Sequence, residues 1–506
     1  MSRSGLLAAV VAIVGLAWGA PDRVLGHAVG GTFQLPVPLW LYLVGAAAAV
    51  AASFAVSTLV SRDESGDAYT ASLVNVSLAA AARVGLRIIG LAWWYGAILV
   101  AFAVGDISPL PAVLLWIGIW VGLPIAAAVA GNPWPSLSPF RTTHAALEWA
   151  ARRLGAGRLD LGLRYPPALA RWPAVVLLLA GIWAELVLPG SATATTVGWL
   201  MLAYTALTLA GMLVVGQIAW LRHAELFEVE LAWFGRIGFI GRRATRAELC
   251  AGCEEACSAE RCIDCPECST AADDDERRPV IRPPFAGLTD VGRPGWSDAA
   301  FIVIALAGVT YDGLRETAFG AGLVGWLLPP ALDLFGTTLT AFLLVDTVAL
   351  LLIVASFLVA FGAMLATTRV VAQGTVTPSP GRYASTLLPI AAGYLVAHYL
   401  TLVIQGAIWL PSLVVDPLMS LAPQLDWIPV SFVWYLSVVA IVGGHVAGIV
   451  LAHRIALREA PARATLAGVP MVALMIGYTI LSLWIIAQPI VVDPGAAPAA
   501  LTRLVP

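Results

Sequence analysis

One long apolar run decides the fold: residues 337–367 read TTLTAFLLVDTVALLLIVASFLVAFGAMLAT, with Asp346 as the only charged residue. A helix needs about 20 apolar residues to cross the hydrocarbon core of a bilayer. The run lacks the alternation of polar and apolar residues that is typical of a membrane β-barrel strand. Because a segment in lipid must satisfy its own backbone polar groups, the run predicts a transmembrane α-helix.

Other apolar runs of the same kind predict about ten spans in total. We expect them near 38–60, 87–106, 109–131, 172–189, 196–220, 298–314, 337–367, 386–410, 429–452 and 469–490. The run at 298–314 is short, and one option is that it pairs with Leu323–Leu332 as a broken or re-entrant element. The predicted fold class is therefore all-α, a polytopic transmembrane helix bundle.

The composition supports a lipid environment. The 506 residues are 60% hydrophobic and 12% charged, whereas soluble domains carry about 25% charged residues. The formal net charge of −3 indicates no nucleic-acid partner. The expected partners are the lipid bilayer, a small ion or small-molecule substrate, and further membrane subunits.

The arginines predict the orientation of the spans. With the mature N-terminus outside and the ten spans alternating, 24 of the 28 basic residues fall in cytosolic loops. This bias follows the rule that cytosolic loops near span ends are enriched in Lys and Arg. We therefore expect the segment 221–297 in the cytosol and the C-terminus outside.

The N-terminus resembles an export signal. Arg3 precedes the short apolar run Leu6–Ala17, and small residues suited to signal peptidase follow, ending at Gly26. We predict a signal peptide over 1–26, with an uncleaved anchor helix as the alternative. Cleavage after Gly26 would make His27 the mature N-terminus, where its amine and imidazole could bind one copper ion; an ordinary loop residue is the alternative.

The remaining chain divides into three parts. Residues 27–220 hold spans one to five, 221–297 form a cysteine-rich loop, and 298–506 hold spans six to ten. Within the first part, Ser138 and Pro139 predict the start of a helix that lies in the membrane interface. Its expected apolar face comprises Ala145, Leu147, Ala150, Ala151 and Leu154.

The cysteines of the chain are clustered in the loop, in the pattern CAGCEEACSAERCIDCPEC. They are Cys250, Cys253, Cys257, Cys262, Cys265 and Cys268. Two-residue gaps allow neighbouring thiolates to share one ion, and disulfides are rare in the cytosol. Zinc is the first prediction, an iron–sulfur cluster the second and copper the third. A metal-free, redox-sensitive loop is the alternative.

Ionisable residues inside spans are costly and indicate function. The intramembrane candidates are Glu185, Asp312, Glu316, Asp346, Tyr394, His398, Gln405, His445 and His453. With Thr401, three of them form a polar stripe in span eight. Gly444 and Gly448 flank His445 in a spacing that lets another helix approach closely. The carboxylates lie towards the outer half and the histidines run inward, which suits a polar path for a cation or proton.

Three classes of function stay open from these residues. A transporter or metal-handling permease would use the intramembrane carboxylates and histidines as its pathway. A membrane-embedded metal-dependent hydrolase would need several His and carboxylate ligands at one place. A structural or assembly subunit would use each polar group only as a buried hydrogen-bonding partner.

Several stretches resemble the fenitrothion hydrolase-like family of multi-pass bacterial and archaeal membrane proteins. They are HAVGGTFQLPVPLWLYLVGAAAAV from residue 27, GNPW from 131, RPPFAGLT from 282, TYDG from 310, LVAHYLTLVIQG from 395 and GGHVAGIVLAH from 443. The resemblance covers nearly the whole mature chain, and the cysteine loop departs from it. It implies organophosphate ester hydrolysis, without a catalytic role for any one residue. The family-like positions are His27, Asn132, Asp312, His398, His445 and His453.

Overall fold

The computed structural model confirms the helical fold class. It describes residues 33–60, 72–73, 76–155, 159–244, 263–264, 277–288, 291–292, 294–374, 377–419 and 421–492. The helices of its first half are α2 (Leu39–Val60), α3 (Val76–Ala103), α4 (Leu110–Ala112), η1 (Val113–Gly122), α5 (Leu123–Ala130), α6 (Trp134–Leu137), α7 (Pro139–Arg153), η2 (Pro167–Leu169), α8 (Trp172–Leu186), α9 (Ala194–Val215), α10 (Gln217–His223) and α11 (Leu226–Phe234).

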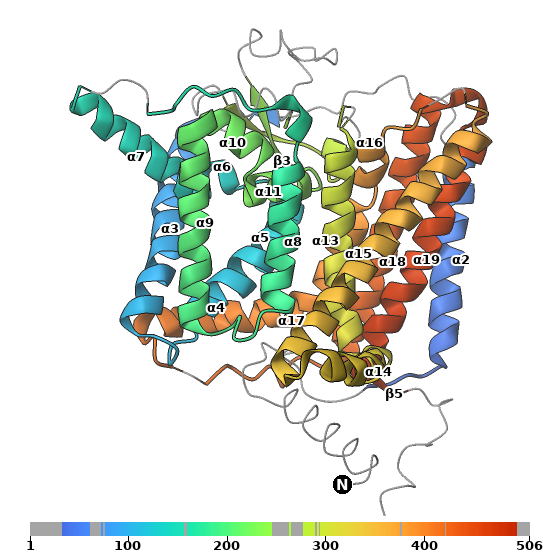
Figure 1. Cartoon of the computed structure of the whole chain (residues 1–506). Coiled ribbons are helices and arrows are strands. Elements are labelled where there is room, and N and C mark those ends of the chain that lie inside the picture. Colours follow the sequence, from blue (N-terminus) through green and yellow to red (C-terminus); the bar gives the residue numbers. More distant parts are fainter. Residues whose placement is uncertain are drawn as a thin grey trace, which may run out of the picture.

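The second half is also helical. Its helices are η4 (Ala286–Leu288), α13 (Trp296–Arg315), α14 (Ala318–Phe335), α15 (Thr338–Val371), α16 (Pro380–Ser385), α17 (Leu388–Val415), α18 (Val430–Glu459), η5 (Pro461–Arg463) and α19 (Ala464–Ile490). Figure 1 shows the long helices side by side as one bundle. Its upper end carries α7, α10 and β3, and its lower end carries α14.

By length and composition, ten helices of the described residues can cross a membrane. They include α14 but leave out α8, which has 15 residues. Their orientations in Figure 1 differ from what their lengths suggest. The shorter α8 stands upright beside α9 and α13, whereas the longer α14 lies across the lower end of the bundle. Helix α13 is a complete span from Trp296 to Arg315, and α14 follows it after a short turn. The protein is therefore a multi-pass membrane protein.

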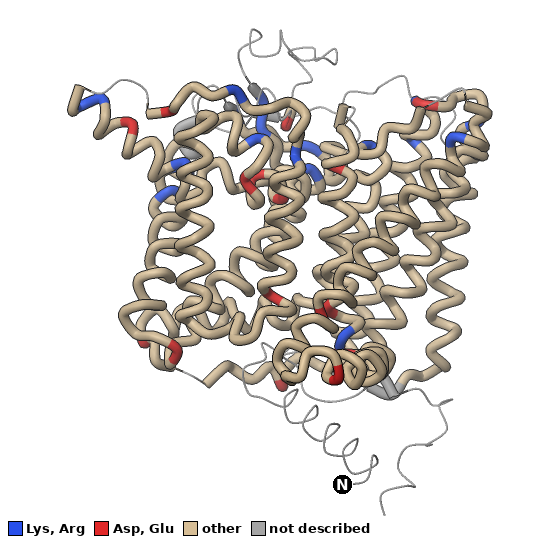
Figure 2. The backbone as a smooth tube through the Cα atoms, in the orientation of Figure 1, with Lys and Arg blue, Asp and Glu red and all other residues tan. Residues whose placement is uncertain are grey.

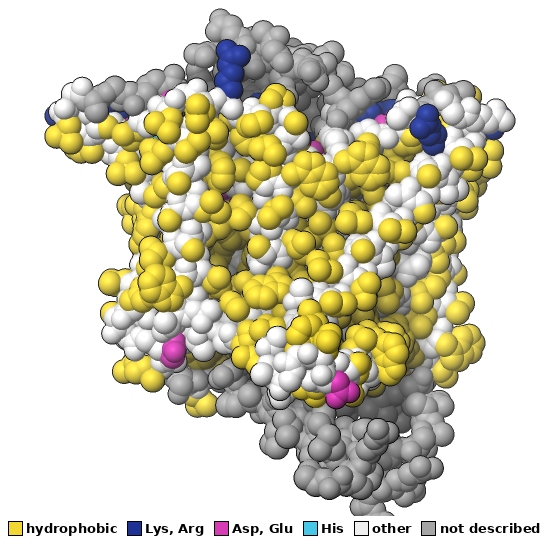
Figure 3. Space-filling model, in the orientation of Figure 1, with side chains coloured by type: hydrophobic (Ala, Val, Ile, Leu, Met, Phe, Trp, Pro, Cys, Tyr) yellow, Lys and Arg dark blue, Asp and Glu magenta, His cyan; other side chains and the backbone are white. Residues whose placement is uncertain are grey.

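The surface has the charge pattern of a bilayer-spanning bundle. Figure 2 shows the arginines gathered at the upper end of the molecule. On the face in Figure 3, hydrophobic side chains cover the middle and charged side chains lie near the two ends. The apolar middle faces lipid, as the composition predicts.

Short strands pair segments that are far apart in the sequence. At the upper end, β3 (Ile240–Ala244) pairs antiparallel with β4 (Arg277–Ile281), and β4 pairs with β2 (Ser72–Leu73). The strands β1 (Phe33–Gln34) and β5 (Val491–Val492) pair in parallel. The strand β3 thus leads into the cysteine segment and β4 leads out of it.

The predicted interfacial helix is present as α7. The Ser138 hydroxyl accepts a hydrogen bond from the Arg141 backbone N–H, which caps the first turn as expected of an N-cap serine. The side chains of Leu147, Trp149 and Leu154 are exposed. Figure 1 shows α7 projecting sideways from the upper end, where an exposed apolar face lies at the level of a membrane interface.

Glycines allow two pairs of helices to approach closely. A Cβ added at Gly444 would lie 2.4 Å from the Pro389 carbonyl oxygen, and one at Gly448 would lie 2.6 Å from the Thr386 carbonyl oxygen. A Cβ at Gly90 of α3 would lie 1.7 Å from the Leu137 carbonyl oxygen of α6. The small residues around His445 therefore pack α18 against the start of α17, as their spacing predicts.

Candidate functional site

Near the lower end, α13 and α17 are joined by a hydrogen-bonded trio. His398 Nε2 lies 3.0 Å from Asp312 Oδ2, and the Tyr399 hydroxyl donates to the same oxygen at 2.5 Å. The His398 side chain is 1% exposed and that of Asp312 is 20% exposed. The imidazole and the phenol thus share one oxygen of the carboxylate, an arrangement that can bind, hold or pass on a proton.

The ring of Tyr394 extends this trio along α17. It stacks on His398 with 5.9 Å between ring centroids. A Cβ added at Gly313 would lie 2.7 Å from the Tyr394 hydroxyl oxygen, so this glycine gives the hydroxyl room beside Asp312. Among the described residues, the buried Tyr394 hydroxyl has no hydrogen-bond partner.

A second ion pair lies beside the trio. Arg315 at the end of α13 donates to Asp346 of α15 at 3.1 Å and to the Leu186 carbonyl oxygen at 2.5 Å. The Tyr311 hydroxyl donates to the backbone oxygen of Asp346 at 3.1 Å. The predicted Asp346 thus has an arginine partner, and Arg315 ties α8, α13 and α15 together.

Glu185 of α8 completes the lower cluster, which we define as Glu185, Asp312, Arg315, Asp346, Tyr394, His398 and Tyr399. Its carboxylate accepts a hydrogen bond of 2.6 Å from Trp120 Nε1. The carbonyl oxygen of the next residue, Leu186, accepts a hydrogen bond from Arg315. Trp120 belongs to η1, a run of wide π-helical turns, a geometry that occurs often at functional sites. The lower cluster therefore draws on four helices, α8, α13, α15 and α17, and η1 contacts it through Trp120.

The other intramembrane candidates have different surroundings. His445 Nδ1 donates to the Ile441 carbonyl oxygen of its own helix at 2.8 Å, and the His453 ring contacts Phe54 edge-on at 5.8 Å. Gln405 donates to the Pro423 carbonyl oxygen, and Glu316 is exposed after the end of α13. Among the candidate histidines in the described part of the chain, His398 is the one that bonds to a carboxylate of the lower cluster.

A second polar centre, which the sequence analysis missed, lies at the upper end around Glu225. Its carboxylate accepts from Trp134 Nε1 at 2.9 Å, from the Tyr204 hydroxyl at 2.5 Å and from the backbone N–H groups of Phe227 and Glu228. The side chain is fully buried. Glu225 is therefore both the N-cap of α11 and the point where α6, α9 and α11 meet.

Two more glutamates of α11 belong to this upper cluster, which we define as Arg141, Trp134, Tyr204, Glu225, Glu228 and Glu230. Glu228 forms an ion pair with Arg141 of α7 at 2.8 Å. Glu230 is 7% exposed, and one of its carboxylate oxygens has no hydrogen-bond partner among the described residues. An unpaired buried carboxylate oxygen costs about 1–3 kcal/mol.

Burial controls protonation in the upper cluster. Desolvation raises the pKa of Glu230 to about 8, and the nearby charge of Glu225 adds to the rise. Desolvation also raises the pKa of Glu225 to about 7, although the Tyr204 and Trp134 hydrogen bonds act in the opposite direction. Both carboxyls can therefore exchange protons near neutral pH.

The missed residues left weak signals in the sequence. Tyr399 directly follows His398, but neighbouring residues on a regular helix point about 100° apart. Tyr399 therefore did not belong to the predicted polar stripe of span eight. The stretch ELFEVELAWF from Glu225 carries three acids within an apolar run, which is unusual for a solvated loop. Trp134 and Asn132 belong to the GNPW stretch, where Asn132 Oδ1 accepts from the Trp134 backbone N–H.

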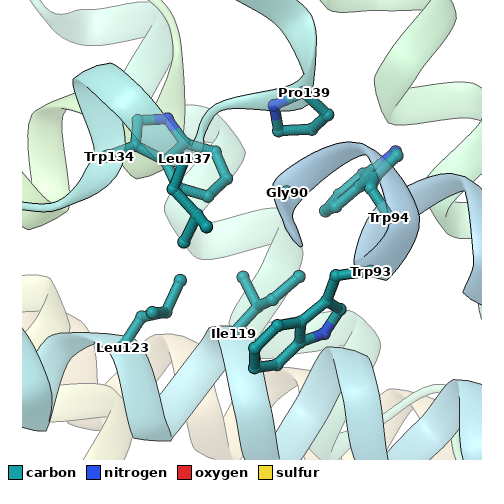
Figure 4. A pocket seen from close by; sticks show the side chains of 8 residues that line it. All are labelled: Gly90, Trp93, Trp94, Ile119, Leu123, Trp134, Leu137 and Pro139. Carbon is teal, nitrogen blue, oxygen red and sulfur yellow. The ribbon is translucent and has the colours of Figure 1, made fainter. Parts of the chain in front are cut away.

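A small apolar pocket lies against the upper cluster. Figure 4 shows its lining, which comes from α3, η1, α5 and the segment around α6: Gly90, Trp93, Trp94, Ile119, Leu123, Trp134, Leu137 and Pro139. Its volume of about 10 Å³ is the space that one water molecule needs. This pocket is a packing gap and is too small for a substrate.

The predicted metal residues lie mostly outside the described part of the chain. This applies to all six cysteines of the loop and to His27. Within the described ranges, no three His, Cys, Asp or Glu side chains lie close enough to share a metal ion. Zinc, iron–sulfur and copper binding by the loop stay predictions.

The chain was compared with known proteins at three levels. No family model, curated protein or solved structure matches it.

Proposed function

We propose that this protein is a membrane carrier that exchanges protons for a small cation, with the lower cluster as the place where the proton binds. The observation that carries the proposal is the trio of Asp312, His398 and Tyr399. Buried ionisable groups that connect two spans are expensive in lipid and mark ion pathways or proton relays. The trio joins a carboxyl to an imidazole, which both change charge when they gain or lose a proton, and Arg315 supplies a fixed positive charge nearby.

In this proposal, the distribution of the arginines gives the orientation of the protein in the membrane. The upper end holds most of them (Figure 2), and the positive-inside rule assigns that end to the cytosol. The lower cluster is then near the outside and the upper cluster near the cytosol. A cation that arrives from outside would meet the carboxylates of Asp312, Asp346 and Glu185 first.

The test uses the purified full-length chain in sealed vesicles that contain a pH-sensitive dye. Gradients of Zn²⁺, Cu⁺, Na⁺ and K⁺ are imposed one at a time, and the internal pH is recorded. We expect at least one cation to drive proton movement, and Asp312→Asn or His398→Gln to abolish it. His445→Gln is the matched control, because this buried histidine donates its hydrogen bond to the Ile441 carbonyl oxygen of its own helix.

Two results would count against the carrier. Vesicles with the unaltered protein that show no ion-driven proton movement for any of the four cations would contradict it. Equal activity of the Asp312→Asn, His398→Gln and His445→Gln variants would also contradict it, because the trio would then be structural. Hydrolysis of an organophosphate ester by the same preparation, lost in the trio variants, would favour the enzyme that the family resemblance implies.

The cysteine loop is proposed as a cytosolic zinc-binding element of the carrier. The six clustered thiols, at spacings that suit one or two ions, support this. Elemental analysis of the purified protein tests it, with a variant in which all six cysteines are serine as the control. We expect stoichiometric zinc that disappears in the serine variant; equal metal contents in both proteins would contradict zinc binding.

A further inference from the structure

Helix α7 leaves the bundle at its upper end with one apolar side and one polar side. Leu147, Ala150 and Leu154 follow one another at helical spacing on the apolar side, and Leu154 is 87% exposed. Glu148 and Arg152 lie on the opposite side of the helix. In Figure 3, hydrophobic side chains lie along the lower edge of this projecting helix, towards the apolar middle of the molecule. The helix therefore has the pattern of a segment that lies in the plane of a membrane interface.

The first half of α7 is fixed to the bundle. Phe140 is fully buried, and the Thr143 hydroxyl shares a hydrogen bond of 2.8 Å with the Tyr95 hydroxyl of α3. Arg141 forms its ion pair with Glu228 of α11. These contacts set the direction of the whole helix, so the exposed side chains of its second half are held in place before anything binds to them.

The outer half of α7, residues 147–154, carries an excess of positive charge. Arg152 is 64% exposed and lies 3.5 Å from Glu148, the one acid of this half. Arg153 forms no ion pair with a described residue, and its guanidinium lies over the Trp149 ring at 5.2 Å from the ring centroid. Trp149 is exposed as well. A positive charge thus lies beside an exposed indole at the level of the membrane surface.

We propose that the outer half of α7 binds the headgroups of anionic phospholipids. Arg152 and Arg153 would contact the phosphates, because a guanidinium donates to phosphate oxygens through a planar fork. Leu147 and Leu154 would lie among the upper parts of the acyl chains, and Trp149 between the two layers, where tryptophan is enriched.

The charge of the helix end favours anionic over zwitterionic lipids. A zwitterionic headgroup also carries a phosphate, but its ammonium group cancels the phosphate charge. An anionic headgroup keeps a net negative charge, which attracts Lys and Arg near the membrane surface. The excess charge of Arg153 therefore gives the surface its expected lipid preference.

A membrane fits this surface better than a soluble partner protein does. The outer half of α7 is only about 12 Å long at the rise of an α-helix. Stable protein interfaces bury about 800 Å² on each partner, which is more than two turns of one helix offer. Its leucines also lie on the side of the apolar middle, where lipid is the solvent. The inference concerns a surface away from the lower cluster and does not rest on the proposed carrier.

The experiment locates bound lipid by photo-crosslinking. The purified full-length protein in detergent micelles is mixed with phosphatidylglycerol that carries a photoreactive headgroup, at concentrations well below saturation. Labelled residues are then found by mass spectrometry. We expect labelling of α7 that unlabelled phosphatidylglycerol suppresses more strongly than phosphatidylcholine does. In the double variant Arg152→Gln with Arg153→Gln this labelling should fall roughly thirtyfold, about fivefold for each arginine near the surface.

Two variants control for charge alone. Arg152→Lys with Arg153→Lys keeps both positive charges and should keep most of the labelling. Arg369→Gln removes one exposed arginine from the last turn of α15 and should leave the labelling of α7 unchanged. The unfolding temperature in detergent confirms that each variant is folded, since all of these side chains are exposed.

Four results would overturn the proposal. They are an α7 without label in the parent protein, equal suppression by the anionic and the zwitterionic lipid, equal losses in Arg369→Gln and in the double glutamine variant, and labelling that survives in the double glutamine variant. Glycerol 3-phosphate is the soluble competitor. If it suppressed the labelling as well as phosphatidylglycerol does, the surface would bind free phosphate and the lipid assignment would be wrong.

Discussion

The lower and upper clusters differ in how their charges are held. In the lower cluster, acids meet bases: Asp312 meets His398, and Asp346 meets Arg315. In the upper cluster, Glu225 and Glu230 are buried and form no ion pair with a described residue, and Glu225 is held by neutral donors instead. The lower cluster therefore stabilises charged groups, whereas the burial of Glu225 and Glu230 in the upper cluster favours their protonated form.

The largest effect is expected from pH and acts through the upper cluster. Its Glu225 and Glu230 have pKa values of about 7 and about 8 in the folded protein, against an ordinary value of 4.5. The folded state therefore binds more protons than the unfolded state between these values. The stability that these protons give is full below pH 4.5 and is lost as the pH rises towards 8.

Thermal unfolding in detergent across pH 5 to 8.5 checks this dependence. Each group adds a slope of about 1.4 kcal/mol per pH unit where its two states differ by a whole proton. Glu230→Gln should flatten the curve above pH 7. The control Glu148→Gln should leave it unchanged, because Glu148 pairs with Arg152 on the surface of α7. A curve that rises with pH in this range would show that the upper cluster is charged in the folded protein.

A change at Gly90 is expected to have the next largest effect. Gly90→Ala places a Cβ 1.7 Å from the Leu137 backbone oxygen, and backbone cannot move aside as a side chain can. We expect a loss of roughly 3 kcal/mol, the upper end for overpacking, seen as a lower unfolding temperature. Gly313→Ala beside the lower cluster should cost less, because its Cβ would meet side-chain atoms of Ile485 and Tyr394, and not backbone.

The control for both glycine changes is Gly45→Ala, where nothing lies within 4 Å of the added Cβ. It should leave the unfolding temperature unchanged or raise it slightly. Equal losses for Gly90→Ala and Gly45→Ala would mean that α3 and α6 are not in close contact.

Truncation of the Glu225 side chain is expected to have the third largest effect. Glu225→Ala leaves the Trp134 N–H and the Tyr204 hydroxyl without their acceptor and removes the cap of α11. The expected cost is about 2 kcal/mol, since each buried donor left unpaired costs about 1–3 kcal/mol. Glu225→Gln keeps a carbonyl acceptor and should recover about half of it.

Thermal unfolding of both Glu225 variants checks this order. Equal stability of the alanine variant and the parent protein would show that α11 does not depend on its cap.

The smallest effect is expected in the lower cluster, from the pair of Arg315 and Asp346. A double-mutant cycle with Arg315→Ala and Asp346→Ala measures the coupling between them. We expect about 1 kcal/mol, because side chains that are 22% and 13% exposed are partly screened by water. A coupling near zero would remove the electrostatic contrast between the two clusters.

The sequence by itself determined the membrane fold and most of the lower cluster. Apolar runs of span length leave a chain no alternative to helices in lipid, and the rare charges within them, such as Asp312, Glu185 and His398, are conspicuous. The same logic predicted the close packing at Gly444 and Gly448. These features depend on one helix at a time, so a pattern along the chain was enough to show them.

Only the tertiary structure decided which of these groups meet. His398 and His445 look alike in sequence, yet one bonds across helices to Asp312 and the other to its own helix. Helix α11 and its glutamates fell within the predicted cytosolic segment 221–297, because nine residues are too short to span a membrane. Their burial depends on α5, α6 and α8 packing around them, a long-range contact that no local pattern along the chain encodes.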